Sequence, residues 1–155
     1  MKKLNLLFSL LVLQIFFVHP LFAQDAESYY NSAVEKTGNG DTDGAIADFT
    51  KAIELDPKYV KAYYSRSIVK SHKSDWDGAL ADSTKAIELE PEYAAAHGSR
   101  GTVKCFKKEW EDAIADFDKA IELDPKDARA YEKRGDVKRA KGDLAGAEAD
   151  QAKAK

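Results

Sequence analysis

The strongest constraint on this chain is an internal repeat. Three closely similar strings, AIADFTKAIELDP, ALADSTKAIELEP and AIADFDKAIELDP, begin at Ala45, Ala79 and Ala113, so each starts 34 residues after the one before. A period of this length is typical of repeat architectures, in which each unit buries its apolar face against its neighbours. At this spacing the chain divides without insertion into four repeats, at 26–59, 60–93, 94–127 and 128–155.

Each repeat has the pattern of two helices. In the second half of the third repeat, apolar residues recur at steps of three and four from Trp110 through Phe117 to Ile121, which describes one face of an α-helix. An acidic residue precedes this helix in every repeat, where it can cap the helix, and a proline follows it in the first three repeats. The last repeat puts polar side chains at several of these positions, as expected of a terminal cap.

The columns of the alignment resemble those of the tetratricopeptide repeat (TPR) family. That pattern has an aromatic residue at position 4, small residues at 8, 20 and 27, an aromatic at 24 and proline at 32. The third repeat fills these columns with His97, Gly101, Ala113, Ala120, Phe117 and Pro125. The chain departs from the pattern with Ser83 and Gln151 at position 24, and with lysine at position 11 of every repeat. The resemblance implies an all-α fold, a right-handed α-solenoid of antiparallel helix pairs with four TPR units over residues 26–155 and about eight helices.

Residues 1–23 have the layout of a signal peptide. Lys2 and Lys3 precede an apolar run, and Ala23 supplies the small residue that a signal peptidase requires. We predict cleavage after Ala23, which makes the mature protein secreted or periplasmic and leaves it without a segment that inserts into a membrane. The alternative is an uncleaved N-terminal anchor, because the stretch from Leu4 to Ala23 is long enough to span a bilayer.

Charge and cysteine content exclude several function classes. The chain has 24 Lys and Arg against 27 Asp and Glu, so it lacks the basic excess that nucleic-acid binding needs. The single cysteine, Cys105, allows no disulfide within the chain and no cysteine-based zinc site, although a disulfide between two chains stays open. Apart from carboxylates, the repeats offer only His72, His97 and Cys105 for catalysis, and no catalytic or metal-binding motif is present. We predict no enzyme activity and no cofactor.

One segment imitates a calcium site. Asn39, Asp41, Asp43 and Gly44 have the spacing of the first half of an EF-hand loop. The twelfth position of that loop is Thr50 instead of the bidentate glutamate. The second repeat keeps the same spacing without the first ligand. We therefore interpret the segment as a turn between helices and predict no metal site.

The family resemblance implies a role in protein–protein interaction. In TPR proteins the first helix of each repeat lines a concave wall, and the corresponding columns predict a partner-binding groove of Tyr30, Val34, Tyr64, Ile68, His72, Phe106, Arg129, Glu132 and Arg139. Its aromatic and apolar members favour binding of an extended peptide or a partner helix, because monomers rarely expose such a patch without use. The basic residues and asparagine of the family's clamp for a C-terminal carboxylate are missing. The alternative function is a structural or weakly self-associating envelope component.

The charged columns predict ion pairs between repeats. Aspartate at position 23 is followed 18 residues later by arginine at position 7 of the next repeat, and both lie nine residues from the intervening proline. Residues equidistant from the turn of an antiparallel hairpin lie at the same level. We therefore predict three inter-repeat pairs and an unpaired aspartate, Asp150, at the C-terminal edge; the pairs are Asp48–Arg66, Asp82–Arg100 and Asp116–Arg134.

Overall fold

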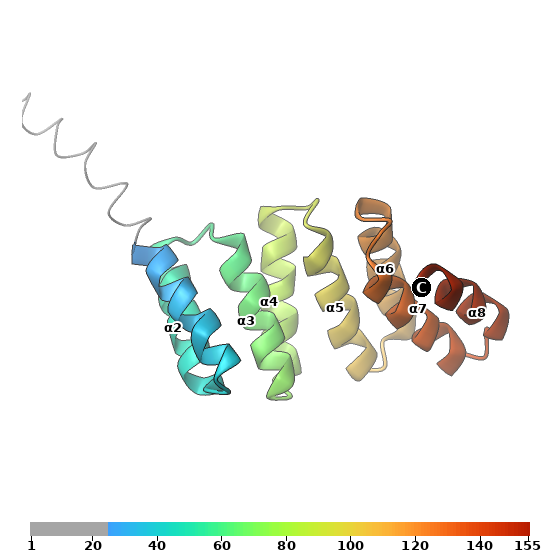
Figure 1. Cartoon of the computed structure of the whole chain (residues 1–155), viewed down its shortest axis with the longest axis horizontal. Helices are drawn as coiled ribbons and strands as arrows, with labels where there is room; N and C mark the ends of the chain where they lie inside the picture. Colours follow the sequence, from blue (N-terminus) through green and yellow to red (C-terminus); the bar gives the residue numbers. More distant parts are fainter. Residues whose placement is uncertain (1–24) are drawn as a thin grey trace, which may run out of the picture. The chain divides into compact units, whose positions relative to one another are not determined.

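The computed structural model describes residues 25–155, and the predicted signal peptide lies outside the described residues. Every regular element in this part of the chain is an α-helix, and Figure 1 shows the helices following one another as hairpins. The predicted all-α repeat fold is confirmed. No helix between residues 25 and 155 is long and apolar enough to cross a membrane. The described chain forms two compact units. The first ends at Tyr59, and the second begins at Val60.

The described part of the first unit is one helical hairpin. Residues 25–38 are helical, and α2 spans Thr42–Leu55. Fully buried alanines let the two helices pack closely, and Phe49, 1% exposed, fills the space between them. The ring of Tyr30 lies 5.6 Å from that of Phe49 and 5.1 Å from that of Tyr59, measured between centroids. Aromatic pairs at such distances stabilise beyond their burial alone.

The second unit consists of three helical hairpins. Its helices are α3 (Val60–His72), α4 (Trp76–Leu89), α5 (Ala94–Phe106), α6 (Trp110–Leu123), α7 (Ala128–Ala140) and α8 (Leu144–Lys153). Each helix contacts the next one along the chain, and α5 also contacts both α3 and α7 (Figure 1). The first helices of the three repeats therefore stand side by side, and together they form one wall of this unit.

Acidic caps begin most of the second helices. The carboxylates of Asp41, Asp75 and Asp143 accept hydrogen bonds from glycine N–H groups three residues later, at 2.9–3.0 Å. At Gly44 an added Cβ would overlap the Asp41 carboxylate, so the cap in this position needs glycine there. This cap accounts for the Asp and Gly residues that imitate a calcium loop. Glu109, which precedes α6, makes no such side-chain bond, so the predicted caps form in three of the four repeats.

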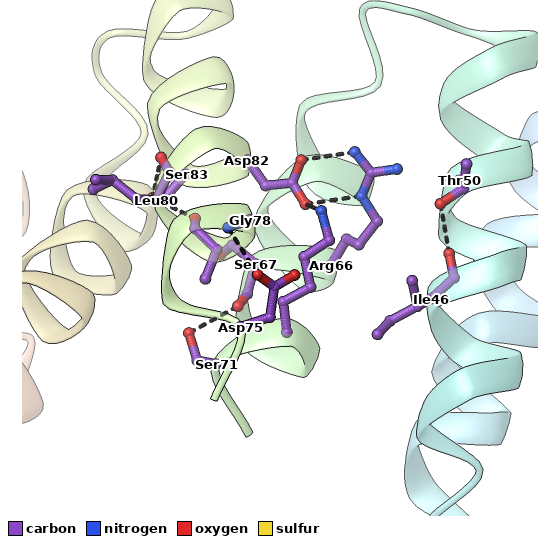
Figure 2. Close-up of polar contacts among 12 residues, drawn as sticks. Ile46, Thr50, Arg66, Ser67, Ser71, Asp75, Gly78, Leu80, Asp82 and Ser83 are labelled. Carbon is purple, nitrogen blue, oxygen red and sulfur yellow. Dashed lines mark hydrogen bonds and ion pairs between the residues drawn. The ribbon is translucent and has the colours of Figure 1, made fainter. Parts of the chain in front are cut away.

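Small residues let the hairpins close, and they differ between repeats. A Cβ at Gly101 would lie 3.0 Å from Cε1 of Phe117, so glycine is needed opposite that ring. In the second repeat serines replace both residues, and Ser67 and Ser83 are fully buried. The Ser83 hydroxyl donates to backbone carbonyl groups of its own helix (Figure 2), and the hydroxyls of Ser67 and Ser99 lie 2.9 Å apart. The departure at position 24 is thus accommodated by hydrogen bonding.

Candidate functional site

A charged cluster connects the two helices of every repeat. In the second repeat, Asp82 accepts hydrogen bonds from Nε and a terminal nitrogen of Arg66, at 2.8 and 2.7 Å (Figure 2). The ammonium group of Lys70 lies 2.8 Å from the same carboxylate. The next two repeats repeat this cluster with Arg100, Lys104 and Asp116 and with Arg134, Lys138 and Asp150; in the first repeat Ser32 and Lys36 hold Asp48.

Two of the predicted inter-repeat pairs, Asp82–Arg100 and Asp116–Arg134, are therefore wrong, and the third, Asp48–Arg66, would join the two units and stays a prediction. Position 7 and position 23 are also equidistant, by eight residues each, from the turn inside a repeat, so the spacing fits both hairpins equally well. The structure selects the hairpin inside the repeat, and Asp48, Asp82 and Asp116 are each held by residues of their own repeat. Asp150 is not an unpaired edge residue, since Arg134 and Lys138 bind it.

Arg134 also reaches the preceding repeat. A terminal nitrogen of Arg134 donates to Asp118 of α6 at 2.6 Å, while its other nitrogens bind Asp150. The hydrogen bonds to Asp150 and Asp118 raise the pKa of Arg134 above its ordinary value, because they outweigh partial burial, which lowers it. In this contact between the third and fourth repeats, the arginine thus binds the aspartate at position 25. The prediction had named the aspartate at position 23.

Each complete cluster places two cations against one carboxylate. The Asp116 side chain is 5% exposed, and those of Arg100 and Lys104 are 22% and 18% exposed. Burial alone would raise the pKa of the Asp116 carboxyl, but hydrogen bonds from Arg100 and Lys104 outweigh burial and hold that pKa below its ordinary value. The same balance lowers the pKa of Asp150. The cluster therefore stabilises the hairpin, and around Asp116 it leaves one positive charge in excess.

A groove crosses the first helices of the second unit. It has a volume of about 370 Å³, within the roughly 300–1,000 Å³ range of ligand pockets, and α3, α5 and α7 supply most of its lining. Tyr64 and Ile68 come from α3, Thr102 and Phe106 from α5, and Arg129 from α7. We call this cavity the α3–α5–α7 groove. Its walls are mainly apolar in the middle, with basic side chains at the end formed by α7.

An aromatic stack borders this groove. Phe106 is 61% exposed, and its ring stacks on that of Trp76 with centroids 4.3 Å apart and an angle of 13° between planes. Lys107, directly after Phe106, forms an ion pair with Asp77, directly after Trp76. Two neighbouring repeats thus fix the Phe106 ring in place while one side of it stays accessible.

Five of the predicted groove residues meet in the α3–α5–α7 groove. They are Tyr64, Ile68, His72, Phe106 and Arg129. Of the other four, two lie in the same unit. Glu132 and Arg139 line a separate small cavity of about 30 Å³ between α7 and α8, and not the α3–α5–α7 groove.

Tyr30 and Val34 belong to the first unit. Tyr30 packs against Phe49 and Tyr59, and Val34 is 47% exposed.

Sequence reasoning missed three lining residues that determine the character of the groove. Gly98, Asp127 and Lys133 all line it, at positions 5, 34 and 6 of their repeats. Positions 34 and 6 are not among the columns from which the groove was predicted. A comparison of the repeats at position 34 would have found Asp127, because the two preceding repeats have tyrosine there.

Charge is segregated between the two kinds of helix in the second unit. Neither α3 nor α5 contains an acidic residue, although α3 carries three lysine or arginine residues and α5 carries two. The opposite holds for α6, which has one lysine against Glu111, Asp112, Asp116, Asp118 and Glu122. Four of the five cations of α3 and α5 are bound to Asp82 and Asp116, so the Lys and Arg side chains that line the groove itself are Arg129 and Lys133 of α7.

Two of the three residues considered for catalysis, His97 and Cys105, lie outside the groove. His97 is 6% exposed, with Nε2 2.9 Å from the carbonyl oxygen of Pro91, and its Nδ1 has no hydrogen-bond partner among residues 25–155. Burial raises the pKa of Cys105 to about 11, which keeps the thiol protonated at neutral pH. Neither side chain lines the α3–α5–α7 groove.

Comparison with protein families identifies the repeats. A family model described as a tetratricopeptide repeat matches residues 26–59, and a model described as a TPR repeat matches residues 105–142. Among curated protein sequences, none matches the chain significantly.

Solved structures with the same fold are numerous. A crystal structure of MamA is 26% identical, with a TM-score of 0.78 over 84% of this chain and 76% of that one. The first TPR of Spaghetti (RPAP3), bound to the HSP90 peptide SRMEEVD, is 22% identical, with a TM-score of 0.75 over 77% of this chain and 95% of that one. The TPR domain of OM64 from Arabidopsis is 21% identical, with a TM-score of 0.75 over 77% and 98% of the two chains.

Proposed function

We propose, from the premise that the chain belongs to the tetratricopeptide-repeat family, that the α3–α5–α7 groove binds an extended peptide segment or a partner helix of another protein. The observation that carries this proposal is the accessible aromatic surface inside the groove. Phe106 is 61% exposed, and it lines one cavity with Tyr64 and Ile68. Exposed apolar surface of this kind, bordered by charged side chains, marks interaction sites. The peptide complex of the similarly folded RPAP3 domain supports the same reading.

The polar groups of the groove favour a ligand with its own charges. The hydroxyls of Ser71 and Thr102 donate to carbonyl groups of their own helices, at 2.9 Å each. Arg129 and Lys133 are exposed at the α7 end and provide the accessible hydrogen-bond donors. The groove therefore combines apolar burial with a cationic end. Proteins of this family and fold are typically non-catalytic scaffolds.

The proposal is tested with a displayed library of random twelve-residue peptides. The parent protein should enrich peptides whose binding is lost in a Phe106→Ser variant. Leu144→Ser is the matched control, because Leu144 is also 61% exposed but lies on α8 and does not line the groove. If no peptide is enriched, or if both variants bind the enriched peptides equally well, the groove is not the binding site. Self-association that increases with concentration, without peptide binding, would favour a structural role.

The compartment is a second part of the proposal. The basic start, apolar run and Ala23 of residues 1–23 support export with removal of this segment. Intact-mass measurement of the protein recovered from the secreted or periplasmic fraction should give a chain that begins at Gln24. Recovery only from the cytoplasm, or from membranes with Met1 retained, would contradict cleavage and export.

A further inference from the structure

The third repeat lacks an aromatic pair that the first two repeats have. In the first repeat Tyr30, at position 5, packs against Tyr59, at position 34, with ring centroids 5.1 Å apart. In the second repeat Tyr64 and Tyr93 hold the same positions, 5.3 Å apart and nearly perpendicular. The corresponding residues of the third repeat are Gly98 and Asp127.

The missing rings leave an opening in the groove. A Cβ built on Gly98 would meet no other atom within 4 Å, so the surface of α5 is bare at this point. Asp127 turns its carboxylate to the backbone N–H of Arg129, 3.0 Å away, where it caps α7. Gly98 and Asp127 both line the α3–α5–α7 groove. The groove therefore includes the place that two tyrosine rings occupy in each preceding repeat.

We propose that this opening receives an aromatic side chain of the bound peptide, and that Arg129 and Lys133 bind an acidic group next to that residue in the peptide. The inference rests on the proposed function and names the peptide class for the same groove. A ring over Gly98 would lie in a cavity whose walls include the Tyr64 and Phe106 rings, and aromatic side chains pack favourably against such walls.

The charges near the opening determine the acidic preference. Lys133 forms no hydrogen bond or ion pair with any residue in the described part of the chain, and the Arg129 side chain is 78% exposed. The only carboxylate lining the groove is that of Asp127, which already caps α7 and lies 3.4 Å from Nε of Arg129. Neither α3 nor α5 adds a negative charge. An acidic peptide group would therefore meet a net positive surface, which favours its association.

A Gly98→Tyr variant tests the opening directly, because it returns a ring to the place that tyrosine holds in the first two repeats. We expect it to weaken the enriched library peptides by at least about tenfold, as loss of a buried aromatic anchor does. Gly98→Ala, which adds only a Cβ in open space, is the matched control and should change affinity by less than about threefold. Far-ultraviolet circular dichroism of both variants verifies that α5 remains folded.

The enriched peptides supply the second readout. They should share a phenylalanine, tyrosine or tryptophan beside aspartate or glutamate, and Lys133→Gln should lower their affinity and its dependence on salt. Peptides that lose binding in Phe106→Ser but carry no aromatic residue, or that bind Gly98→Tyr as well as the parent, would overturn this inference and leave the proposed function standing. Peptides insensitive to Phe106→Ser would contradict the proposed function itself.

Discussion

Replacing Asp116 with alanine should destabilise the second unit by about 3 kcal/mol. The carboxylate is 5% exposed and accepts two hydrogen bonds from Arg100, at 2.9 and 2.6 Å, and one from Lys104, at 2.8 Å. Its removal leaves two cations at a seam between helices without their counter-ion. Breaking a fully buried pair costs about 3–5 kcal/mol, and the partial exposure of Arg100 and Lys104 places the expected value at the lower end.

Urea unfolding followed by tryptophan fluorescence measures this effect. Trp76 and Trp110 are the only tryptophans of the chain and both lie in the second unit, so their emission reports on that unit. Asp112→Ala is the matched control, since Asp112 is exposed in the first turn of the same helix, and it should cost less than about 1 kcal/mol. A loss below about 0.5 kcal/mol for Asp116→Ala would mean that the cluster behaves as an ordinary surface ion pair, and would refute the reasoning.

Three further predictions concern acid stability, thiol reactivity and glycine packing. Because the pKa of Asp116 is lowered in the folded state, the stabilisation by its carboxylate is complete above the unfolded pKa near 3.9 and is lost as the pH falls through the folded pKa. The unfolding free energy of Asp116→Asn should therefore change less than that of the parent between about pH 5 and 2. Equal pH dependence of the two proteins would contradict this. Cys105, with its pKa raised to about 11, should react with iodoacetamide much more slowly at pH 8 in the native protein than in urea, and equal rates would show that it is not shielded. Gly98→Ala should stabilise the protein in urea by about 0.5–1 kcal/mol. Gly101→Ala should destabilise it, because the added Cβ would lie 3.0 Å from Phe117. A gain of the same size at both sites would refute the packing argument.

The sequence predicts the helices well because their signals are local. The apolar steps along α6, the acidic caps and the following prolines each depend on residues within a few positions of one another. The sequence also showed where the chain departs from the family pattern, but it did not show why. Lysine at position 11 is explained only by the structure, in which Lys70 and its counterparts bind the aspartate at position 23.

The charged pairs could not be assigned from spacing alone. Along the chain, Arg100 and Asp116 are equally far from the turn inside their own repeat. Arg100 and Asp82 are equally far from the proline between their repeats. Both hairpins therefore place an aspartate at the level of the arginine, and only the packing of α5 against α6 decides between them. A recurring lysine one helical turn after the arginine was the available signal, because both side chains reach the same partner.

The sequence predicted several of the repeat positions that line the groove, but it did not predict the opening in the groove. Tyr64, Ile68 and Phe106 follow from the family positions, whereas the opening over Gly98 exists because a side chain is absent there. Glu132, at the same position 5 of the last repeat, lies instead against α8 in a separate cavity. The same position in two repeats thus has different surroundings where the neighbouring side chains differ.

The most direct test of the account is to map where a peptide selected on the parent protein binds. Amide ¹H–¹⁵N spectra recorded during titration should show their largest shifts along α3, α5 and α7, at Ile68, Gly98, Thr102, Phe106 and Lys133, which line the groove. Small shifts are expected on the acidic faces of α4 and α6. Shifts concentrated on α4, α6 or α8, with the amides of the groove unchanged, would contradict the claim that the α3–α5–α7 groove is the binding site.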